Sequence, residues 1–217
     1  FTEFIDFNQE SELFNFKQNS YIENDINDGK YIGFNEPDYL YHGFWGRDNE
    51  ISFLNDKKSD QFISLIYGSG GLGKTALADF FVSEYLKDDE YDEIRWISKK
   101  EQFLDLDTGK IKKGNDDNLK LLSEELDKSS KKILFVLDNI DDYLNQAENF
   151  VERYKNKFSF ILTSRILHDF DFPFTKRHIE SLDRTPSTSL IKKIAEINGD
   201  DEIIKMSEDE LNDVVEK

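Results

Sequence analysis

Residues 68–75 read GSGGLGKT and fit the pattern G-x-x-x-x-G-K-[ST], with Gly68, Gly73, Lys74 and Thr75 at its fixed positions. Glycines open backbone conformations that a Cβ excludes, so successive N–H groups can converge on one phosphate. A helix that starts there adds its positive end to the same anion. The stretch therefore predicts a phosphate-binding loop, against the alternative of a flexible glycine turn that fits by chance.

The flanking sequence supplies the context that such a loop requires. Residues 62–67 form an apolar run typical of a buried parallel strand, and residues 75–86 space apolar side chains as a helix does. Lys74 is expected to reach the β- and γ-phosphates of a nucleotide, and the Thr75 hydroxyl to complete the ligand shell of a Mg²⁺ ion. The other residues expected to contact the nucleotide are Ser69, Gly70, Gly71, Leu72 and Ala76.

Strand and helix patterns continue to alternate downstream. We predict strands at residues 93–98, 133–138, 158–164 and 178–182, helices at 118–126, 143–154, 186–197 and 207–215, and an inserted loop or hairpin at 104–118. Strands separated by helices indicate a parallel sheet with right-handed crossovers. The expected fold class is α/β, a three-layer P-loop NTPase with a parallel sheet, followed by the beginning of a helical subdomain.

Composition limits the partners. The 217 residues include 28 Lys and Arg against 46 Asp and Glu, so the formal net charge is −18. This excludes a nucleic-acid backbone as the main partner and disfavours an anionic membrane surface, because both need many cations. A nucleotide still fits, since one Lys and backbone N–H groups can hold it. The chain has no Cys, which favours a reducing, cytoplasmic compartment.

Asp138 is the predicted acidic ligand of the magnesium ion. It follows five apolar residues of the run ILFVLD (133–138), and we expect that strand to neighbour the strand of the phosphate loop. A strand-end Asp also caps helices, which is the alternative interpretation. The assignment therefore depends on the phosphate loop at residues 68–75.

Candidate catalytic groups follow this strand and the next one. Asn139 comes directly after Asp138 and is a poor base, so Asp141 or Asp142 are substitutes, unless they are only the N-terminal charges of a helix. Arg165 ends the run FSFILTSR and is expected to read the γ-phosphate, against the alternative of a surface ion pair. We assign Asp138, Arg165 and Asp142 to catalysis and expect slow hydrolysis at best.

The segment FWGRDNEI (44–51) lies ten residues before the first strand. Trp45 is a candidate cover for an adenine ring, or else a core or lid aromatic. Arg47 is expected either to contact the nucleotide or to hold this segment in place. The three His residues show no metal-ligand spacing.

Taken in order, these motifs resemble the nucleotide-binding module of the signal-transduction ATPases with numerous domains (STAND), in its NB-ARC type. The resemblance covers about residues 44–217 and rests on FWGRDNEI, GSGGLGKT, EIRWIS, ILFVLDNIDD and FSFILTSR. It implies that Trp45 and Arg47 lie on the adenine side, that Asp138 is the magnesium acid and that Arg165 senses the γ-phosphate. Asn139 stands where the plant members have a second acid, and LDNIDD also resembles the NACHT pattern, so the subfamily stays open.

The resemblance implies a switch. ADP holds such modules closed, and exchange for ATP permits self-oligomerisation of the full-length protein, which brings effector domains together in signalling, innate immunity or antiviral defence. The alternatives are a turnover P-loop ATPase or kinase, and a partner-binding domain that no longer uses its loop. A kinase would need a clear base, which Asn139 is not.

Three segments are expected along the chain. Residues 1–40 lack a sustained period and are predicted to be irregular or a linker, residues 41–182 form the nucleotide-binding domain, and residues 183–217 start a helical (ARC1-like) subdomain. Because the chain begins with Phe1 and ends at a helix that resembles the one before the family's glycine-proline motif, we expect it to be a piece of a longer protein.

Overall fold

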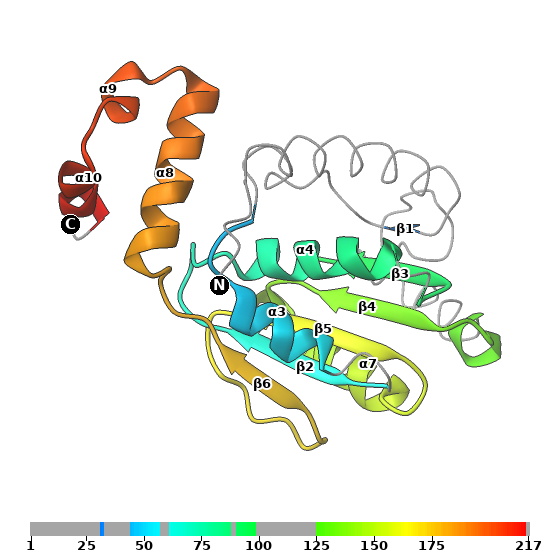
Figure 1. The fold of residues 1–217 in the computed structure, drawn as a ribbon. Helices are drawn as coiled ribbons and strands as arrows, with labels where there is room; N and C mark the ends of the chain where they lie inside the picture. The colour runs from blue at the N-terminus through cyan, green and yellow to red at the C-terminus, as the bar shows by residue number, and fades with distance from the viewer. Residues whose placement is uncertain (1–30, 33–43, 57–60, 88–89, 99–124, 216–217) are drawn as a thin grey trace, which may run out of the picture.

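A parallel sheet forms the centre of the computed structural model, which describes residues 31–32, 44–56, 61–87, 90–98 and 125–215. Its six strands follow the order β1-β3-β4-β5-β2-β6, and every pair of neighbours is parallel (Figure 1). The strands are β1 (Tyr31–Ile32), β2 (Ile63–Tyr67), β3 (Glu93–Ile97), β4 (Ile133–Leu137), β5 (Ser159–Ser164) and β6 (Thr175–His178). All carboxyl ends therefore lie along one edge of the sheet.

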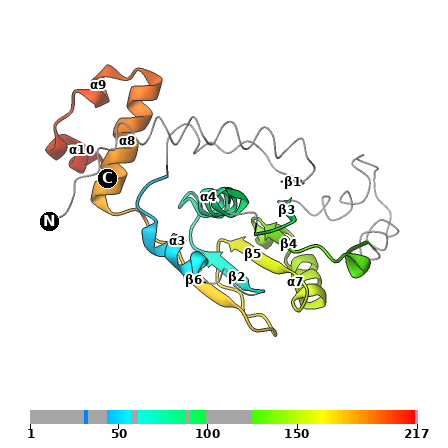
Figure 2. The same cartoon turned by 45° about the vertical axis from the view of Figure 1, so that its right-hand side comes forward.

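Helices cover both faces of this sheet. The helices that cover it are α3 (Asp48–Asn55), α4 (Lys74–Lys87) and α7 (Leu144–Tyr154), and the 3₁₀ turn η1 (Ile140–Asp142) precedes α7. Three further helices, α8 (Arg184–Asn198), α9 (Asp201–Ile204) and α10 (Glu208–Val215), follow the last strand. α3 and α4 pack on one face through Leu54 and Phe81, whereas α7 packs on the other through Val151 (Figure 2). The predicted three-layer α/β fold is confirmed.

The central strands are rich in apolar residues because both of their faces are covered, and β4 (ILFVL) is apolar along its whole length. Every residue of β4 is buried, and so is every residue of β5. On the α7 side, the Phe135 ring lies 5.0 Å from that of Phe150 and 5.5 Å from that of Phe160. The carboxyl ends of β4 and β5 lead directly into the residues of the candidate site.

The last strand of the sheet was predicted at the wrong residues. The sequence indicates residues 178–182, but β6 covers Thr175–His178. Only alternate side chains of this edge strand are partly buried, so its sequence TKRH lacks an apolar run. The N–H of Ile179 still donates to Tyr67 O at 2.8 Å, after which the chain leaves the sheet.

Other predictions differ from the structure or lie outside its described part. Within the predicted linker 1–40, β1 pairs with β3, so at least these residues belong to the sheet. α3 and α9 were not predicted, and α9, with four residues, is too short to show a helical period. The predicted insertion at 104–118 and most of the predicted helix 118–126 lie outside the described residues.

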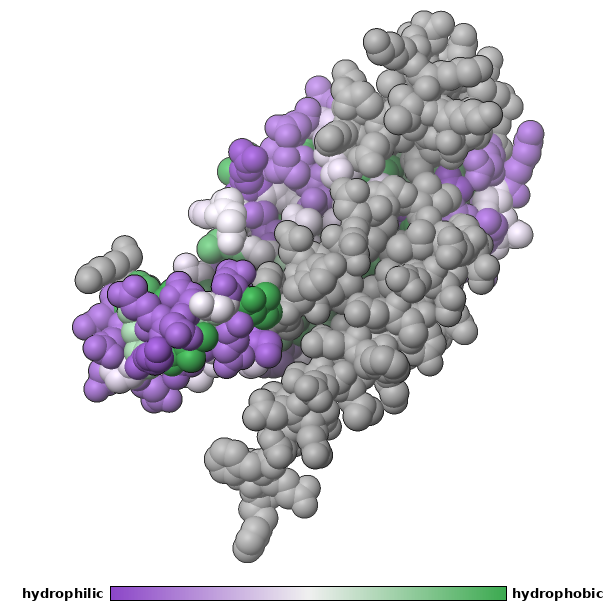
Figure 3. Space-filling model, turned by 90° about the horizontal axis from the view of Figure 1, so that it is seen from above, coloured by the Kyte–Doolittle hydropathy of each residue, from purple (hydrophilic) through white to green (hydrophobic). Residues whose placement is uncertain are grey.

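Helices α8–α10 form a separate unit beyond the sheet (Figure 1). α8 ends at Gly199, whose backbone is left-handed (φ +68°), and the Asp200 side chain caps α9. This end of the molecule is mostly hydrophilic in Figure 3, with a few apolar side chains among the charges. Within the described ranges, no helix combines the length and apolarity that crossing a bilayer requires.

Candidate functional site

The glycine loop connects β2 to α4 at the carboxyl edge of the sheet. Gly73 has a left-handed backbone (φ +84°), which favours glycine, and its carbonyl accepts the first helical hydrogen bond from Leu77 N at 2.8 Å. The first turn of α4 carries no acidic residue. The first turn of the helix therefore brings no carboxylate of its own to compete with an anion at the positive end.

Gly68 is required for a close approach of two chain segments. A Cβ on Gly68, whose φ is +150°, would lie 2.5 Å from Ile179 O. The Gly68 N–H donates to Ser164 O at 3.2 Å. Gly68 therefore lets the loop pass between the ends of β5 and β6.

We expect Gly68→Ala to lower the free energy of unfolding by about 1–3 kcal/mol, the usual cost of forcing atoms into a packed site. Gly70→Ala is the matched control, because a Cβ there meets no atom within 4 Å. Urea unfolding of both variants measures the difference. Equal stabilities would contradict the close approach to Ile179.

Lys74 is the cation of the loop. Its side chain is only 9% exposed, and its Nζ donates to Ser69 O at 2.7 Å. Burial lowers the pKa of Lys74, the charges of Asp141 and Asp138 oppose this shift, and that of Arg165 adds to it. The four charged groups therefore lie close enough to act on one another at this edge.

Thr75 and Asp138 meet although their sequence positions are far apart. Thr75 Oγ1 donates to Asp138 Oδ1 at 2.9 Å, and Thr163 Oγ1 donates to the same oxygen at 2.5 Å. A hydroxyl and a carboxylate oxygen are hard ligands of the kind that Mg²⁺ takes, together with phosphate oxygens. The residues present therefore fit the magnesium site that the sequence predicts at Thr75 and Asp138.

The expectation that the strands of Asp138 and of the loop are neighbours is wrong. β5 lies between β4 and β2, and its Thr163 fills the position between Asp138 and the loop. The Asn139 N–H also donates to Thr163 Oγ1, at 2.8 Å. Thr163 is a site residue that the sequence analysis missed, since a Thr in an apolar strand gives no signal of its own.

The acids after Asp138 differ in their surroundings. Asn139 has a left-handed backbone (φ +56°), unusual for a residue other than glycine. Its side chain donates to Asp142 Oδ2 at 2.8 Å, and Asp142 is exposed. Asp141 is half-buried and faces the end of β5. Of the two acids proposed from sequence, the structure thus directs Asp141 and not Asp142 toward the neighbouring strand.

Arg165 follows β5 directly, at the same edge as the loop. Its side chain is exposed, and its backbone N–H donates to Asp141 Oδ2 at 2.8 Å. Its charge lowers the pKa of Lys74. This position agrees with a role toward a phosphate held by the loop.

Arg47 holds backbone segments together. It is 7% exposed, and its Nη2 donates to Leu72 O at 2.9 Å and to Glu180 O at 2.8 Å. This observation favours the second of the two roles that the sequence left open, holding the segment. Trp45, two residues before it, is half-buried. Gly46 lies directly against Pro186 of α8.

A glycine loop at this edge of a parallel sheet, with helices on both faces, defines the P-loop NTPase class. The NB-ARC domain family matches residues 48–198, which is most of the chain. The chain belongs to this family, and it is a nucleotide-binding module of the STAND class. No curated protein matches it.

Solved structures share the fold at low sequence identity. A DNA replication initiation factor is 18% identical with a TM-score of 0.55, over 84% of this chain and 64% of that chain. The HORMA:CdnC:Trip13 complex of E. coli MS115-1 contains a chain 12% identical with a TM-score of 0.55, over 84% and 78%. A STAND protein with a tetratricopeptide repeat sensor from Pyrococcus horikoshii is 19% identical, with a TM-score of 0.43, over 80% and 28%.

These likenesses show the fold alone, and the third is too low to carry an argument. The chain spans 64% of the replication factor and 28% of the STAND protein. What those longer proteins bind or do is therefore not transferred to this one.

Proposed function

We propose that this module is an ATP/ADP switch that binds its nucleotide with Mg²⁺ and hydrolyses ATP slowly. The observation that carries the proposal is the Thr75–Asp138 hydrogen bond of 2.9 Å beside the buried Lys74. It joins the start of α4 to the end of β4, so a phosphate donor, a magnesium ligand and the helix terminus share one edge of the sheet. Membership of the family supports the proposal that the module binds a nucleotide. The side chains of Thr75 and Asp138 support the proposal that Mg²⁺ binds with it.

Each residue has a defined task in this proposal. Backbone N–H groups from Ser69 to Ala76 and the Lys74 ammonium bind the phosphates, while Thr75 and Asp138 hold the magnesium ion. A bound Mg²⁺ neutralises charge between the β- and γ-phosphates. Arg165 contacts the γ-phosphate, which ADP lacks, and Trp45 lies toward the adenine. In this proposal, Arg165 at the end of β5 distinguishes ATP from ADP by contacting the γ-phosphate.

Slow hydrolysis follows from the acids. Asn139 follows Asp138, the exposed Asp142 is hydrogen-bonded to Asn139, and Asp141 is engaged by the β5 segment. A general base must reach the proton that it abstracts, and in this proposal these hydrogen bonds make Asp141 and Asp142 inefficient bases. A long-lived ATP state suits a switch better than a turnover enzyme.

In the full-length protein, we propose that the ATP state permits self-oligomerisation in the cytoplasm. Attached effector domains would then act together in signalling or defence. Arg47 and Gly46 support such coupling, since they connect the phosphate loop and the nucleotide-side segment to the start of α8.

The purified protein should bind both ADP and ATP in calorimetry with Mg²⁺, and EDTA should weaken ATP binding by about tenfold, because Thr75 and Asp138 then act without their metal. Steady-state phosphate release should stay well below the roughly 1–100 s⁻¹ typical of kinases. Turnover within that range would favour the ATPase or kinase alternative. Failure to bind either nucleotide would contradict the proposal.

A further inference from the structure

The Asp141 side chain connects the turn after β4 to the end of β5. Its Oδ2 accepts from the Arg165 N–H at 2.8 Å. Its Oδ1 accepts from Ser164 Oγ at 2.8 Å and lies 3.3 Å from His168 Nε2. Both carboxylate oxygens are thus used on the segment that contains Arg165.

The turn that carries Asp141 is itself held in place. Asn139 enters it with a left-handed backbone, and its N–H is bonded to Thr163 Oγ1. At the other end, the Tyr143 hydroxyl is buried within hydrogen-bond distance of Ile97 O (2.9 Å) and Asp138 O (2.8 Å). The position of Asp141 is therefore fixed relative to Asp138.

These contacts argue against Asp141 as a general base. Burial by itself raises the pKa of Asp141, but hydrogen bonds from the Arg165 backbone, Ser164 and His168 outweigh it and leave the pKa below its ordinary value. A carboxylate held in its ionised form by such donors is a weak proton acceptor. Its bonds serve to hold a segment.

We propose that Asp141 is a positioning residue for Arg165, which sets the preference of the module for ATP over ADP. The inference rests on the proposed function, in which Arg165 contacts the γ-phosphate. Arg165 stands at the point where β5 ends, and the next two residues, Ile166 and Leu167, are exposed. The bond from its N–H to Asp141 fixes the backbone from which this exposed side chain extends. Without it, the guanidinium meets a γ-phosphate less often in the correct geometry.

The test compares Mg·ADP with Mg·AMPPNP, an ATP analogue that resists hydrolysis, by calorimetry. Asp141→Asn should lower the ratio of AMPPNP affinity to ADP affinity about tenfold, because the lost charge near Lys74 affects both nucleotides and a misplaced Arg165 affects only the γ-phosphate. Arg165→Ala should also lower the ratio of AMPPNP affinity to ADP affinity. The double variant should lose no more AMPPNP affinity than Arg165→Ala alone, as expected for residues that act as a unit. Asp169→Asn is the matched control, an exposed carboxylate four residues after Arg165.

The outcomes separate the inference from the proposed function. If Arg165→Ala shifts the ratio and Asp141→Asn does not, the positioning role is wrong and the switch stands. If Arg165→Ala leaves the ratio unchanged, the γ-phosphate role of Arg165 is wrong and the inference falls with it. If Asp141→Asn lowers the affinities for ADP and AMPPNP equally, Asp141 has only a structural role and the proposal is overturned.

A second variant covers the case in which Asp141→Asn does not fold. Ser164→Ala removes one of the donors to Asp141 and keeps the carboxylate. It should shift the ratio of AMPPNP to ADP affinity in the same direction by a smaller factor. An unchanged ratio in folded Ser164→Ala overturns the proposal.

Discussion

Lys74→Met should lower the affinity for Mg·ATP about 100-fold, because charge-assisted hydrogen bonds contribute about 1.5–3 kcal/mol each and the ammonium is expected to contact two phosphates. Methionine keeps the aliphatic stem of this buried side chain, so the change removes the charge and the donors and little of the packing. Calorimetry with Mg·ATP and Mg·ADP measures the loss. The affinity for Mg·ADP should fall less, since ADP loses only the contact of Lys74 with the β-phosphate.

The control for this substitution is Lys176→Met. Lys176 is an exposed cation on the edge strand β6, so the variant has the same net charge without touching the loop. Its affinity should equal that of the wild type. A similar loss in both variants would show that the total charge of this acidic protein, and not the position of Lys74, determines nucleotide binding.

Lys74→Met should also lower the free energy of unfolding by about 1 kcal/mol, since its bond to Ser69 O is lost. This cost is small beside the expected loss of affinity. The two effects are separable because unfolding is measured without nucleotide. A folded variant that binds poorly is therefore the expected result.

The parts of the fold that could be predicted are those with strong local signals. β4 is apolar along its length and β5 has an apolar centre because both are covered on both faces, and the loop at residues 68–75 has a fixed spacing. Both signals lie within a few consecutive residues. Strand order does not, so the sequence could not show that β5 lies between β2 and β4.

The orientation of the acids could not be predicted either. Asp141 and Asp142 are adjacent in sequence, yet one faces β5 and the other is exposed. The turn that presents Asp141 to the Arg165 N–H begins with a left-handed backbone at Asn139. Asn tolerates this conformation more readily than most residues, but its presence after a strand does not predict it.

Arg47 shows a third limit. Its acceptors are the backbone carbonyls of Leu72 and Glu180, and a carbonyl is present at every residue whatever the side chain. A partner of this kind leaves no trace in sequence. The sequence could therefore raise the structural role of Arg47 only as one alternative, and the geometry was needed to favour it.

Arg47→Met should lower the free energy of unfolding by about 4 kcal/mol, because two partly buried hydrogen bonds from a charged donor are lost, at roughly 1.5–3 kcal/mol each. Burial lowers the pKa of Arg47, while the charges of Glu50 and Asp183 oppose the shift, so this cation is held in place by its hydrogen bonds at the expense of its hydration. Met fills a similar volume without donors. Urea unfolding in the absence of nucleotide measures the effect.

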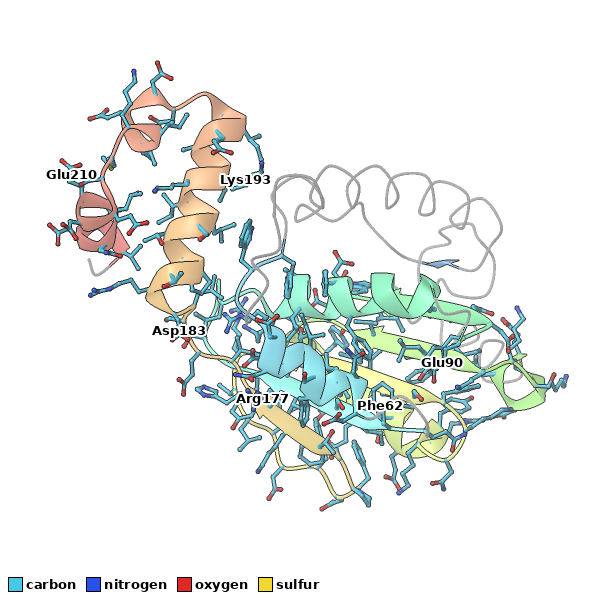
Figure 4. All side chains as sticks on the ribbon, in the orientation of Figure 1. Phe62, Glu90, Arg177, Asp183, Lys193 and Glu210 are labelled. Atoms are coloured by element: carbon cyan, nitrogen blue, oxygen red, sulfur yellow. The ribbon has the colours of Figure 1, made fainter. Side chains whose placement is uncertain are left out.

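Arg177→Met is the matched control, on β6 beside α3 (Figure 4). Arg177 is half-buried and forms a 3.0 Å ion pair with Glu50, so its loss should cost about 1–2 kcal/mol, less than the loss of Arg47. If Arg47 served mainly to contact the nucleotide, Arg47→Met would keep its stability and lose only affinity. The opposite result, a large loss of stability without nucleotide, identifies Arg47 as the residue that ties the phosphate loop to the segment leading into α8.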